Sequence, residues 1–429
     1  MAGYGVGVSD WHFKPHRRSA AVAPTDLTAD LTPPLCLVPG LAGSRLVDAA
    51  GKTRWMTLPR AMDCCECISR PLTLPLEWDV DKQQSDGLVP DDVLKELSCC
   101  GATAKNIYGE FDSYFSQQGR TMVTFSYDFR RDLNESAARL EAHLENVVAE
   151  HGQPAQVVAH SLGCMLALAV LHRRPELVHS AVLCGGVFAG GPGFHELTLF
   201  GIFHGVSNHL LSPAAATTWA SSYQMSSLAP SDRASSIRHQ EIVDLDELKQ
   251  GRRTVVPFDW YTLDDWKRLQ LGPWRPGQPP VSDALEAHVA TAVKLGHRFQ
   301  WHLEHSTRPA HEYPPIATLV SVGHPGRDHI AMDTKTSMLY GLHRAPKGLS
   351  EAILKQTARN SDGVVLEDAS VPHGVPFEKH ISRNNVKHGD LVDETEQLDE
   401  ILEGLRRRAK GAAAPPPAPL SMERNALSS

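Results

Sequence analysis

Short apolar runs alternate with longer segments of helical periodicity through the middle of this chain. The runs typical of buried strands occupy residues 35–38, 122–125, 157–158, 181–184 and 316–322. Apolar residues at helical spacing fill residues 134–150, follow residue 161 up to Pro175, and recur over residues 393–408. Because strands that alternate with helices form parallel sheets covered on both faces, the pattern predicts one α/β domain.

One strand is joined to the next helix by the turn Ala159-His160-Ser161-Leu162-Gly163. Strand and helix approach closely in such a turn, which gives the small residues Ala159 and Gly163 a steric reason. The turn would lift the Ser161 hydroxyl above the sheet, at a helix N-terminus whose free N–H groups can stabilise an oxyanion. This pattern is the nucleophile elbow, so the sequence predicts an α/β-hydrolase fold with Ser161 as nucleophile.

Length and composition set the domain boundaries that we expect. At 429 residues the chain is long for one domain, which predicts a large insertion, placed here at about residues 190–312. Residues 1–32 lack periodicity, and the chain becomes rich in Ala and Pro after Lys410. We therefore expect disordered tails at 1–32 and 410–429 around a hydrolase domain of residues 33–409.

Charge and hydropathy exclude several classes of protein. A net charge of −8 argues against general nucleic-acid binding, which favours a basic surface. The basic residues near the start of the chain lack a following apolar core and cleavage site, and no run reaches the roughly 18 apolar residues of a membrane span. We expect a cytoplasmic protein without cofactor or metal, and leave open its oligomeric state and its contact with membrane surfaces.

The eight cysteines divide into two groups. Cys36, Cys164 and Cys184 fall on predicted strands or on the elbow helix, and are expected to be buried thiols that act as small hydrophobic residues. The other five bracket one segment: Cys64, Cys65, Cys67, Cys99 and Cys100. Their spacing matches no standard zinc site, and without a secretory signal we favour reduced thiols over a disulfide-closed loop or a metal site.

Five short motifs occur in order along the chain, at residues 37–46, 127–130, 159–163, 361–365 and 387–391. Together they resemble the motifs of the lecithin:cholesterol acyltransferase family. Phe129 stands where the family has Trp, while Ser361 and Val364 replace a Gly and a Thr. Members of this family are acyltransferases and phospholipases A that act on lipid esters, so the resemblance implies hydrolysis or acyl transfer on a lipid ester.

A catalytic triad can be predicted from chemistry and chain order. Since a serine hydroxyl is a poor nucleophile at neutral pH, a histidine must take its proton and a carboxylate must orient that histidine. In this fold the order is serine, acid, histidine, which Ser161, Asp362 and His388 obey. The competing candidates are Asp328 and Asp333 for the acid, and His373 and His380 for the base.

An oxyanion hole needs two N–H donors near the nucleophile. One is expected from Leu162, directly after the serine, and the other from Leu41, where Gly40 lets the backbone approach closely. His160 is expected to pack beside the elbow or to hydrogen-bond locally. Its side chain should point away from the Ser161 hydroxyl. In residues 127–130, the Asp and Arg side chains are expected to pair or to bond loop backbone at the top of the sheet.

The predicted cap leaves two interpretations open. Residues 195–223 are apolar and loosely periodic, which suits either an acyl-chain-binding lid or a buried helix pair. Aromatic residues further along either line a hydrophobic pocket or pack the cap: Phe258, Trp260, Tyr261, Trp266 and Trp274.

The sequence as a whole predicts a serine hydrolase or acyltransferase that acts on a lipid-like ester through an acyl-enzyme on Ser161. A carboxylesterase for small soluble esters is the nearer alternative. A catalytically silent protein that binds a lipid or a partner is the more distant one, and the presence of Ser161, Asp362 and His388 argues against it. The acyl donor, the acceptor and the choice between water and alcohol are left open.

Overall fold

The computed structural model describes residues 32–56, 72–99, 102–190, 212–234, 241–326, 328–340 and 358–411. The predicted tails, apart from residues 32, 410 and 411, lie outside this part of the chain, as do the apolar stretch 195–211 and four cysteines, Cys64, Cys65, Cys67 and Cys100. The elements described below belong to one unit that begins at Pro33.

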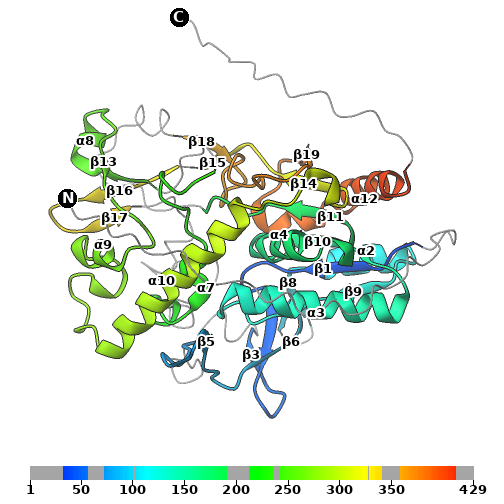
Figure 1. Cartoon of the computed structure of the whole chain (residues 1–429), viewed down its shortest axis with the longest axis horizontal. Coiled ribbons are helices and arrows are strands. Elements are labelled where there is room, and N and C mark those ends of the chain that lie inside the picture. The colour runs from blue at the N-terminus through cyan, green and yellow to red at the C-terminus, as the bar shows by residue number, and fades with distance from the viewer. Residues whose placement is uncertain are drawn as a thin grey trace, which may run out of the picture. The chain divides into compact units, whose positions relative to one another are not determined.

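A six-stranded sheet forms the centre of this unit (Figure 1), in the order β19-β14-β11-β10-β1-β9. Every neighbouring pair in it is parallel. The strands are β1 (Leu35–Val38), β9 (Met122–Thr124), β10 (Ala155–His160), β11 (Val178–Cys184), β14 (Ile316–Val320) and β19 (Glu378–Ile381). The predicted α/β-hydrolase fold, with its mostly parallel sheet, is confirmed.

Helices cover both faces of this sheet. On one face lie α3 (Leu133–His151) and α4 (Leu162–Arg173), and on the other α2 (Gly109–Gln117) and α12 (Thr395–Ala409). In β1, Cys36 and Val38 join the core on the α3 and α4 side, while Leu35 and Leu37 join the core on the opposite side. Because successive side chains point to opposite faces, a strand covered on both sides must be apolar throughout.

The helix boundaries follow local chemistry. The Asp132 side chain accepts a hydrogen bond from the Asn134 amide and caps the start of α3, while Gly152 ends the helix with a φ of 70°. The helix predicted over residues 393–408 is present but begins two residues later, and Asp393 belongs to the preceding element. Residues His388–Asp393 form the 3₁₀ helix η4, and α12 follows from Thr395, burying Leu398, Leu402 and Leu405 among others.

The chain leaves the central sheet after β11 and returns to it at β14. The described elements between them are α6 (Pro213–Ala216), α7 (Ala220–Gln224), β12 (Glu241–Asp244), α8 (Leu245–Lys249), β13 (Val255–Val256), α9 (Leu263–Arg268), η2 (Gly272–Trp274), α10 (Asp283–Glu304) and η3 (Ala310–Glu312). A second sheet, β13-β12-β16-β17, combines two of these strands with β16 (His329–Asp333) and β17 (Met338–Tyr340). The second sheet therefore uses residues on both sides of β14.

The aromatic residues of this region pack against one another. Trp260 and Trp266 are 5% and 2% exposed and share a hydrophobic cluster with Tyr223. The Trp266 Nε1–H donates to the Trp260 carbonyl at 2.8 Å, which also satisfies its polar atom. Of the two interpretations of these aromatic residues, the structure supports packing of the region's own core.

Smaller sheets and turns complete the unit. They comprise β2 (Ser44–Val47), β3 (Thr53–Trp55) and β6 (Val89–Val93) in one sheet, the pairs β4 (Trp78–Asp79) with β5 (Lys82–Gln83), β7 (Glu96–Cys99) with β8 (Ala102–Asn106) and β15 (His324–Gly326) with β18 (Arg359–Ser361), and the 3₁₀ helix η1 (Pro175–Leu177). None of the helices in the described ranges is long and apolar enough to cross a membrane.

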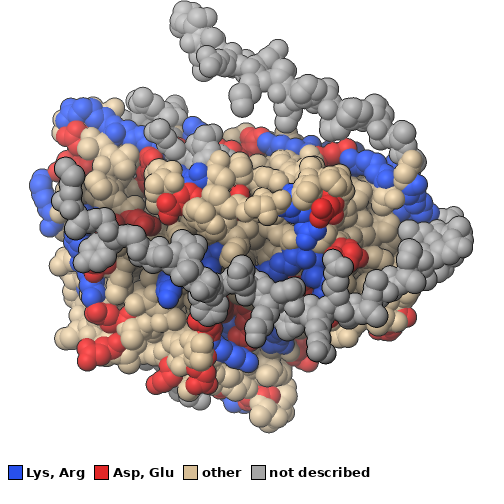
Figure 2. Space-filling model, in the orientation of Figure 1, with Lys and Arg blue, Asp and Glu red and all other residues tan. Residues whose placement is uncertain are grey.

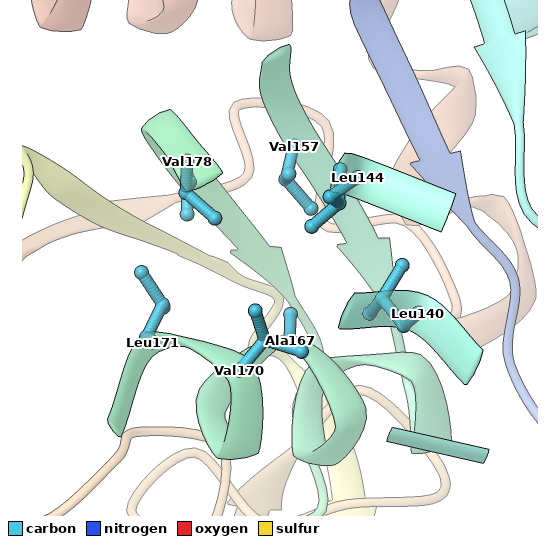
Figure 3. Close-up of a pocket in the computed structure, with 8 residues that line it drawn as sticks. Leu140, Leu144, Val157, Ala167, Val170, Leu171 and Val178 are labelled. Atoms are coloured by element: carbon cyan, nitrogen blue, oxygen red, sulfur yellow. The ribbon is translucent and has the colours of Figure 1, made fainter. Parts of the chain in front are cut away.

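Figure 3 shows an apolar gap under the sheet where α3 and α4 meet β10 and β11, lined by side chains such as Leu140, Val157 and Val170. This gap contains no polar lining residue and belongs to the packing of the core. On the face shown in Figure 2, basic and acidic side chains are interspersed rather than gathered into one stripe.

Candidate active site

Ser161 occupies a strained turn between β10 and α4. Its φ is 54° and its ψ is −120°, a conformation that costs a non-glycine residue on the order of 1–3 kcal/mol. The turn is held by the Ser161 amide, which donates to the Cys184 carbonyl at 2.9 Å, and by the Cys164 amide, which donates to the Ser161 carbonyl at 3.0 Å. A Cβ at Gly163 would lie 2.5 Å from the Val38 and Pro39 carbonyl oxygens, so this position tolerates only glycine.

The structure brings Ser161, His388 and Asp362 together from three separate segments. The His388 Nε2 lies 2.9 Å from the Ser161 Oγ, and its Nδ1 lies 2.6 Å from the Asp362 Oδ2. A carboxylate can only accept hydrogen bonds, so Nδ1 carries the proton and Nε2 is left to accept from the serine hydroxyl. The side chains thus form the hydrogen-bond sequence that the chain order predicted.

Asp362 follows β18 in a tight turn that fixes its carboxylate. The Asp362 Oδ1 accepts from the amides of Val364 at 2.9 Å and Val365 at 2.7 Å, which leaves Oδ2 for His388. The backbone adds a further link, since the His388 amide donates to the Asp362 carbonyl at 3.0 Å. Burial raises the pKa of Asp362, but His388 and the two backbone amides outweigh it and hold the pKa below its ordinary value.

The competing candidates lie in other surroundings. Asp328 pairs with Arg253 at 3.0 Å and with its neighbour His329 at 2.9 Å, at the start of β16 in the second sheet. Asp333 ends that strand and accepts from the Lys335 amide. Of the two alternative bases, His373 is exposed, and His380 on β19 lies 3.5 Å from Glu378. The structure places none of the four against the serine.

The loop after β1 lies directly against Ser161. A Cβ at Gly40 would be 2.8 Å from the Ser161 Cβ, so the backbone approaches as closely as a glycine permits. Leu41 comes next in this loop, and Leu162 is the first residue of α4. Within the part of the chain that is described, neither the Leu41 nor the Leu162 amide donates a hydrogen bond, so both are available to an oxyanion.

Residues 127–130 brace the same loop. The Tyr127 hydroxyl donates to the Pro39 carbonyl at 3.0 Å. The fully buried Arg130 guanidinium bonds both oxygens of Asp128, at 2.9 and 2.8 Å, and both oxygens of Asp86, at 2.6 and 3.0 Å. Burial disfavours its charge, but the two carboxylates overcome this and raise its pKa. The predicted pairing of Asp128 with Arg130 is confirmed, and Asp86 is a partner that the sequence did not indicate.

His160 does not reach the Ser161 hydroxyl. Its Nδ1 lies 2.8 Å from the Tyr108 hydroxyl, and its Nε2 lies 2.9 Å from the His388 carbonyl oxygen. The expectation that this side chain points away from the Ser161 hydroxyl agrees with this geometry, but its partners are distant in the sequence and not local. Tyr108 also accepts from the Gly40 amide at 2.9 Å. Sequence reasoning missed Tyr108, because nothing around it in the chain marks it as part of a site.

The described residues include no group of three or more His, Cys, Asp or Glu side chains that could hold a metal ion. Cys36, Cys164 and Cys184 are buried free thiols, as predicted. Burial raises the pKa of Cys36 to about 12, so its thiol stays protonated at neutral pH. These cysteines serve as small apolar residues of the core.

The sheet and its helices have the α/β-hydrolase fold, with Ser161 at the turn between β10 and α4. The family model for lecithin:cholesterol acyltransferase matches residues 109–247. This match confirms the resemblance over a segment that contains residues 127–130 and the elbow, and it ends before Asp362 and His388. A search of curated protein sequences finds no match.

Comparison with solved structures shows the fold through one of the two structures described here. A chain in the crystal structure of the Tle4-Tli4 complex is similar to this one with a TM-score of 0.52 and 12% identity, covering 89% of this chain and 99% of that one. The mature lipase BlEst2 of Bacillus licheniformis gives a TM-score of 0.36 with 11% identity, covering 89% of this chain and 95% of the lipase. At 12% identity, the first likeness concerns the fold.

Proposed function

We propose that this protein is a serine-dependent enzyme that hydrolyses or transfers the acyl group of a lipid-like ester. Ser161 is the nucleophile, His388 the general base and then acid, and Asp362 the group that orients His388. The observation that carries the proposal is the buried hydrogen-bond sequence from Asp362 through His388 to Ser161, at 2.6 and 2.9 Å.

The proposed reaction proceeds in two halves. The Ser161 Oγ attacks the ester carbonyl carbon while its proton passes to the His388 Nε2. The tetrahedral intermediate collapses, the ester C–O bond breaks, and the leaving alcohol takes that proton, which leaves an acyl group on Ser161. Water or a second alcohol then attacks the acyl-enzyme, again losing its proton to His388, and Ser161 recovers the proton as the product leaves.

The Leu41 and Leu162 amides are the proposed oxyanion donors. Both belong to backbone that packs against Ser161, and a helix N-terminus such as that of α4 favours negative charge. Removal of one such donor typically costs about 3 kcal/mol of transition-state stabilisation. Substitutions other than proline leave both N–H donors in place, so their geometry is best tested through the neighbouring Gly40.

The lipid-like substrate is supported by the family match, because the matched family is named for acyl transfer from lecithin to cholesterol. We propose that residues of about 190–312 form the cap that selects the acyl chain. A carboxylesterase for small soluble esters uses the same triad, so these two functions differ in the preferred acyl length. We also propose, as in the sequence analysis, that the protein is cytoplasmic.

A series of p-nitrophenyl esters from acetyl to palmitoyl, presented with and without mixed phosphatidylcholine vesicles, tests this proposal. We expect turnover that rises toward long acyl chains and falls by about 10⁶-fold in Ser161→Ala. The matched control is Ser221→Ala, since Ser221 is a buried serine of α7 whose hydroxyl has no partner among the described residues.

Three results would contradict the proposal in different ways. The highest rates on acetyl esters would support the small-ester carboxylesterase instead. Activity of Ser161→Ala within tenfold of the wild type would mean that another residue is the nucleophile. A folded wild-type protein with no turnover on any ester would revive the silent, lipid-binding alternative.

A further inference from the structure

A tyrosine and a histidine join two parts of the candidate site that are far apart in the sequence. Tyr108 is the residue before α2, and its side chain is 3% exposed. His160 is the last residue of β10 and is 6% exposed. The two rings meet edge to face, with centroids 5.8 Å apart, and their hydrogen bonds reach the loop that contains Gly40 and the start of η4 at His388.

The direction of each hydrogen bond in this link follows from the atoms that take part. The His388 carbonyl oxygen can only accept, so the His160 Nε2, 2.9 Å away, must carry a proton and donate it. A neutral imidazole then has a bare Nδ1, which accepts from the Tyr108 hydroxyl at 2.8 Å. The hydroxyl oxygen in turn accepts from the Gly40 amide at 2.9 Å. Every polar atom of the link is thereby satisfied in a single arrangement.

The link ends at Gly40 on one side and at His388 on the other. The proposed reaction depends on the relative position of these two parts of the site. Gly40 directly precedes Leu41, one of the proposed oxyanion donors, and its Cα faces the Ser161 Cβ. His388 supplies the proposed base, and its ring centroid is 5.0 Å from that of His160. Asp362 accepts hydrogen bonds from the side chain and the backbone amide of His388, whereas His160 donates to the His388 carbonyl oxygen.

We propose that Tyr108 and His160 are positioning residues that lock the oxyanion loop to the backbone of the base. Neither side chain touches the Ser161 hydroxyl, so they act through Gly40 and His388 rather than on the substrate. This inference rests on the proposed function, since it assigns the pair a role in that reaction. A misplacement of reacting groups by about 1 Å can cost on the order of 10²-fold in rate, which is the size of effect to seek.

The neutral state of His160 fits this role. Burial, reinforced by the nearby His388, lowers the pKa of His160 to about 3. The ring therefore stays uncharged and keeps its donor on Nε2 at any pH where the enzyme would work. An uncharged neighbour also adds no repulsion when His388 takes up a proton during the reaction.

The rest of the chain contains a matched control. The Tyr313 hydroxyl lies 2.7 Å from the His172 Nδ1, and the His172 Nε2 lies 3.1 Å from the Leu303 carbonyl oxygen at the end of α10. This second link has the same three parts in the same order, but neither end belongs to the site. Tyr→Phe at either position removes one hydroxyl from one Tyr–His link and keeps the ring.

The test compares kcat and KM for ester hydrolysis in the wild type, Tyr108→Phe and Tyr313→Phe, together with the melting temperature of each protein. We expect Tyr108→Phe to lower kcat by 10- to 100-fold with KM within twofold of the wild type. We expect Tyr313→Phe to lower the melting temperature by a similar amount as Tyr108→Phe while kcat stays within twofold.

A second pair of variants covers the case in which Tyr108→Phe fails to fold. His160→Gln keeps one acceptor and one donor, whereas His160→Phe keeps only the ring volume. We expect His160→Gln to retain at least a fifth of the wild-type kcat and His160→Phe to lose at least tenfold more than His160→Gln. Such rescue by the conservative variant would not arise from ring packing alone.

The outcomes separate this inference from the proposed function. An active wild type with Tyr108→Phe within twofold of it, or with equal loss in Tyr313→Phe, would overturn the positioning role and leave the triad standing. A folded wild type that turns over no ester and takes no fluorophosphonate on Ser161 would overturn the proposed function and the positioning role with it. Equal kcat in His160→Gln and His160→Phe would also overturn the positioning role.

Discussion

The same three-part link occurs twice in the described part of the chain, once beside the candidate active site and once away from it. Tyr108, His160 and the His388 carbonyl form the first, and Tyr313, His172 and the Leu303 carbonyl the second. The tyrosine to Nδ1 distances are 2.8 and 2.7 Å, and the Nε2 to carbonyl distances are 2.9 and 3.1 Å. Burial lowers the pKa of His160 to about 3 and of His172 to about 4.

The difference between the two links lies in what they hold. The distal link fastens the end of α10, through Leu303, to the end of α4, where His172 lies. The link at the site fastens the loop at Gly40 to the backbone of His388. Equal hydrogen bonds therefore serve stability in one region and, in our account, the alignment of reacting groups in the other. The chemistry of a contact does not reveal its role until its two ends are known.

The largest expected effect distinguishes Asp362, the proposed acid at the site, from Asp328, the competing acid beside the second sheet. Asp362→Asn should lower kcat on the order of 10⁴-fold, because an amide no longer fixes the reactive tautomer of His388. Asp328→Asn should leave kcat within twofold and lower the melting temperature, since Arg253 and His329 lose a shared partner. Steady-state kinetics with thermal unfolding measures both, and a severe loss of kcat in Asp328→Asn alone would move the acid to the second sheet.

A smaller effect is expected from crowding one end of the link at the site. Gly40→Ala places a Cβ 2.8 Å from the Ser161 Cβ, so the loop must shift, and kcat should fall by about 10²-fold. The control is Gly389→Ala, next to His388, where a new Cβ would meet no atom within 4 Å. We expect that variant to keep at least half of the wild-type kcat. Equal losses in the two variants would mean that crowding of the oxyanion loop is not the cause.

The smallest expected effect is on stability at low pH, and it should be similar for the two links. Each histidine has an ordinary pKa of 6.5 in the unfolded chain and a much lower pKa in the folded protein. The folded protein is therefore more stable above pH 6.5 than below it. As the pH falls below 6.5, each buried histidine should reduce the free energy of unfolding by up to about 1.4 kcal/mol per pH unit. This loss should continue to about pH 3 for His160 and about pH 4 for His172.

Urea unfolding between pH 7 and pH 4.5 measures this dependence. His160→Gln and His172→Gln should each flatten the slope of unfolding free energy against pH by a similar amount. Equal changes would mean that the two links contribute equally to the stability of the folded protein. The effects of the Tyr→Phe variants on kcat would then show that only the link at the site contributes to catalysis. An unchanged slope in either variant would mean that folding does not lower the pKa of its histidine.

Much of this architecture could be predicted because its signals are local in the sequence. The apolar strands, the turn at Ser161 and the chain order of Ser161, Asp362 and His388 each depend on a few neighbouring residues. The structure agrees on the strands, with β1 at Leu35–Val38 as predicted, and brings the three side chains together. The motif around Asp362 was sufficient to choose it over Asp328, without knowledge of contacts between distant segments.

What could not be predicted depends on contacts between distant segments. Tyr108 precedes His160 by 52 residues and lies in a segment without a motif. The second sheet pairs β12 with β16, which follows β14 in the sequence, so this sheet also uses residues beyond 312. Asp86 reaches Arg130 from a loop that carries no pattern of its own. In each case the partner is specified only by the folded chain.

The most direct test of the central claim is to label the folded protein with a fluorophosphonate and to map the adduct by peptide mass spectrometry. The account predicts a single adduct on Ser161 in the wild type and its absence in His388→Ala, because the serine reacts only when His388 takes its proton. An adduct on another serine, or equal labelling of Ser161 in His388→Ala, would contradict it. So would a folded wild-type protein that stays unlabelled both with and without lipid vesicles.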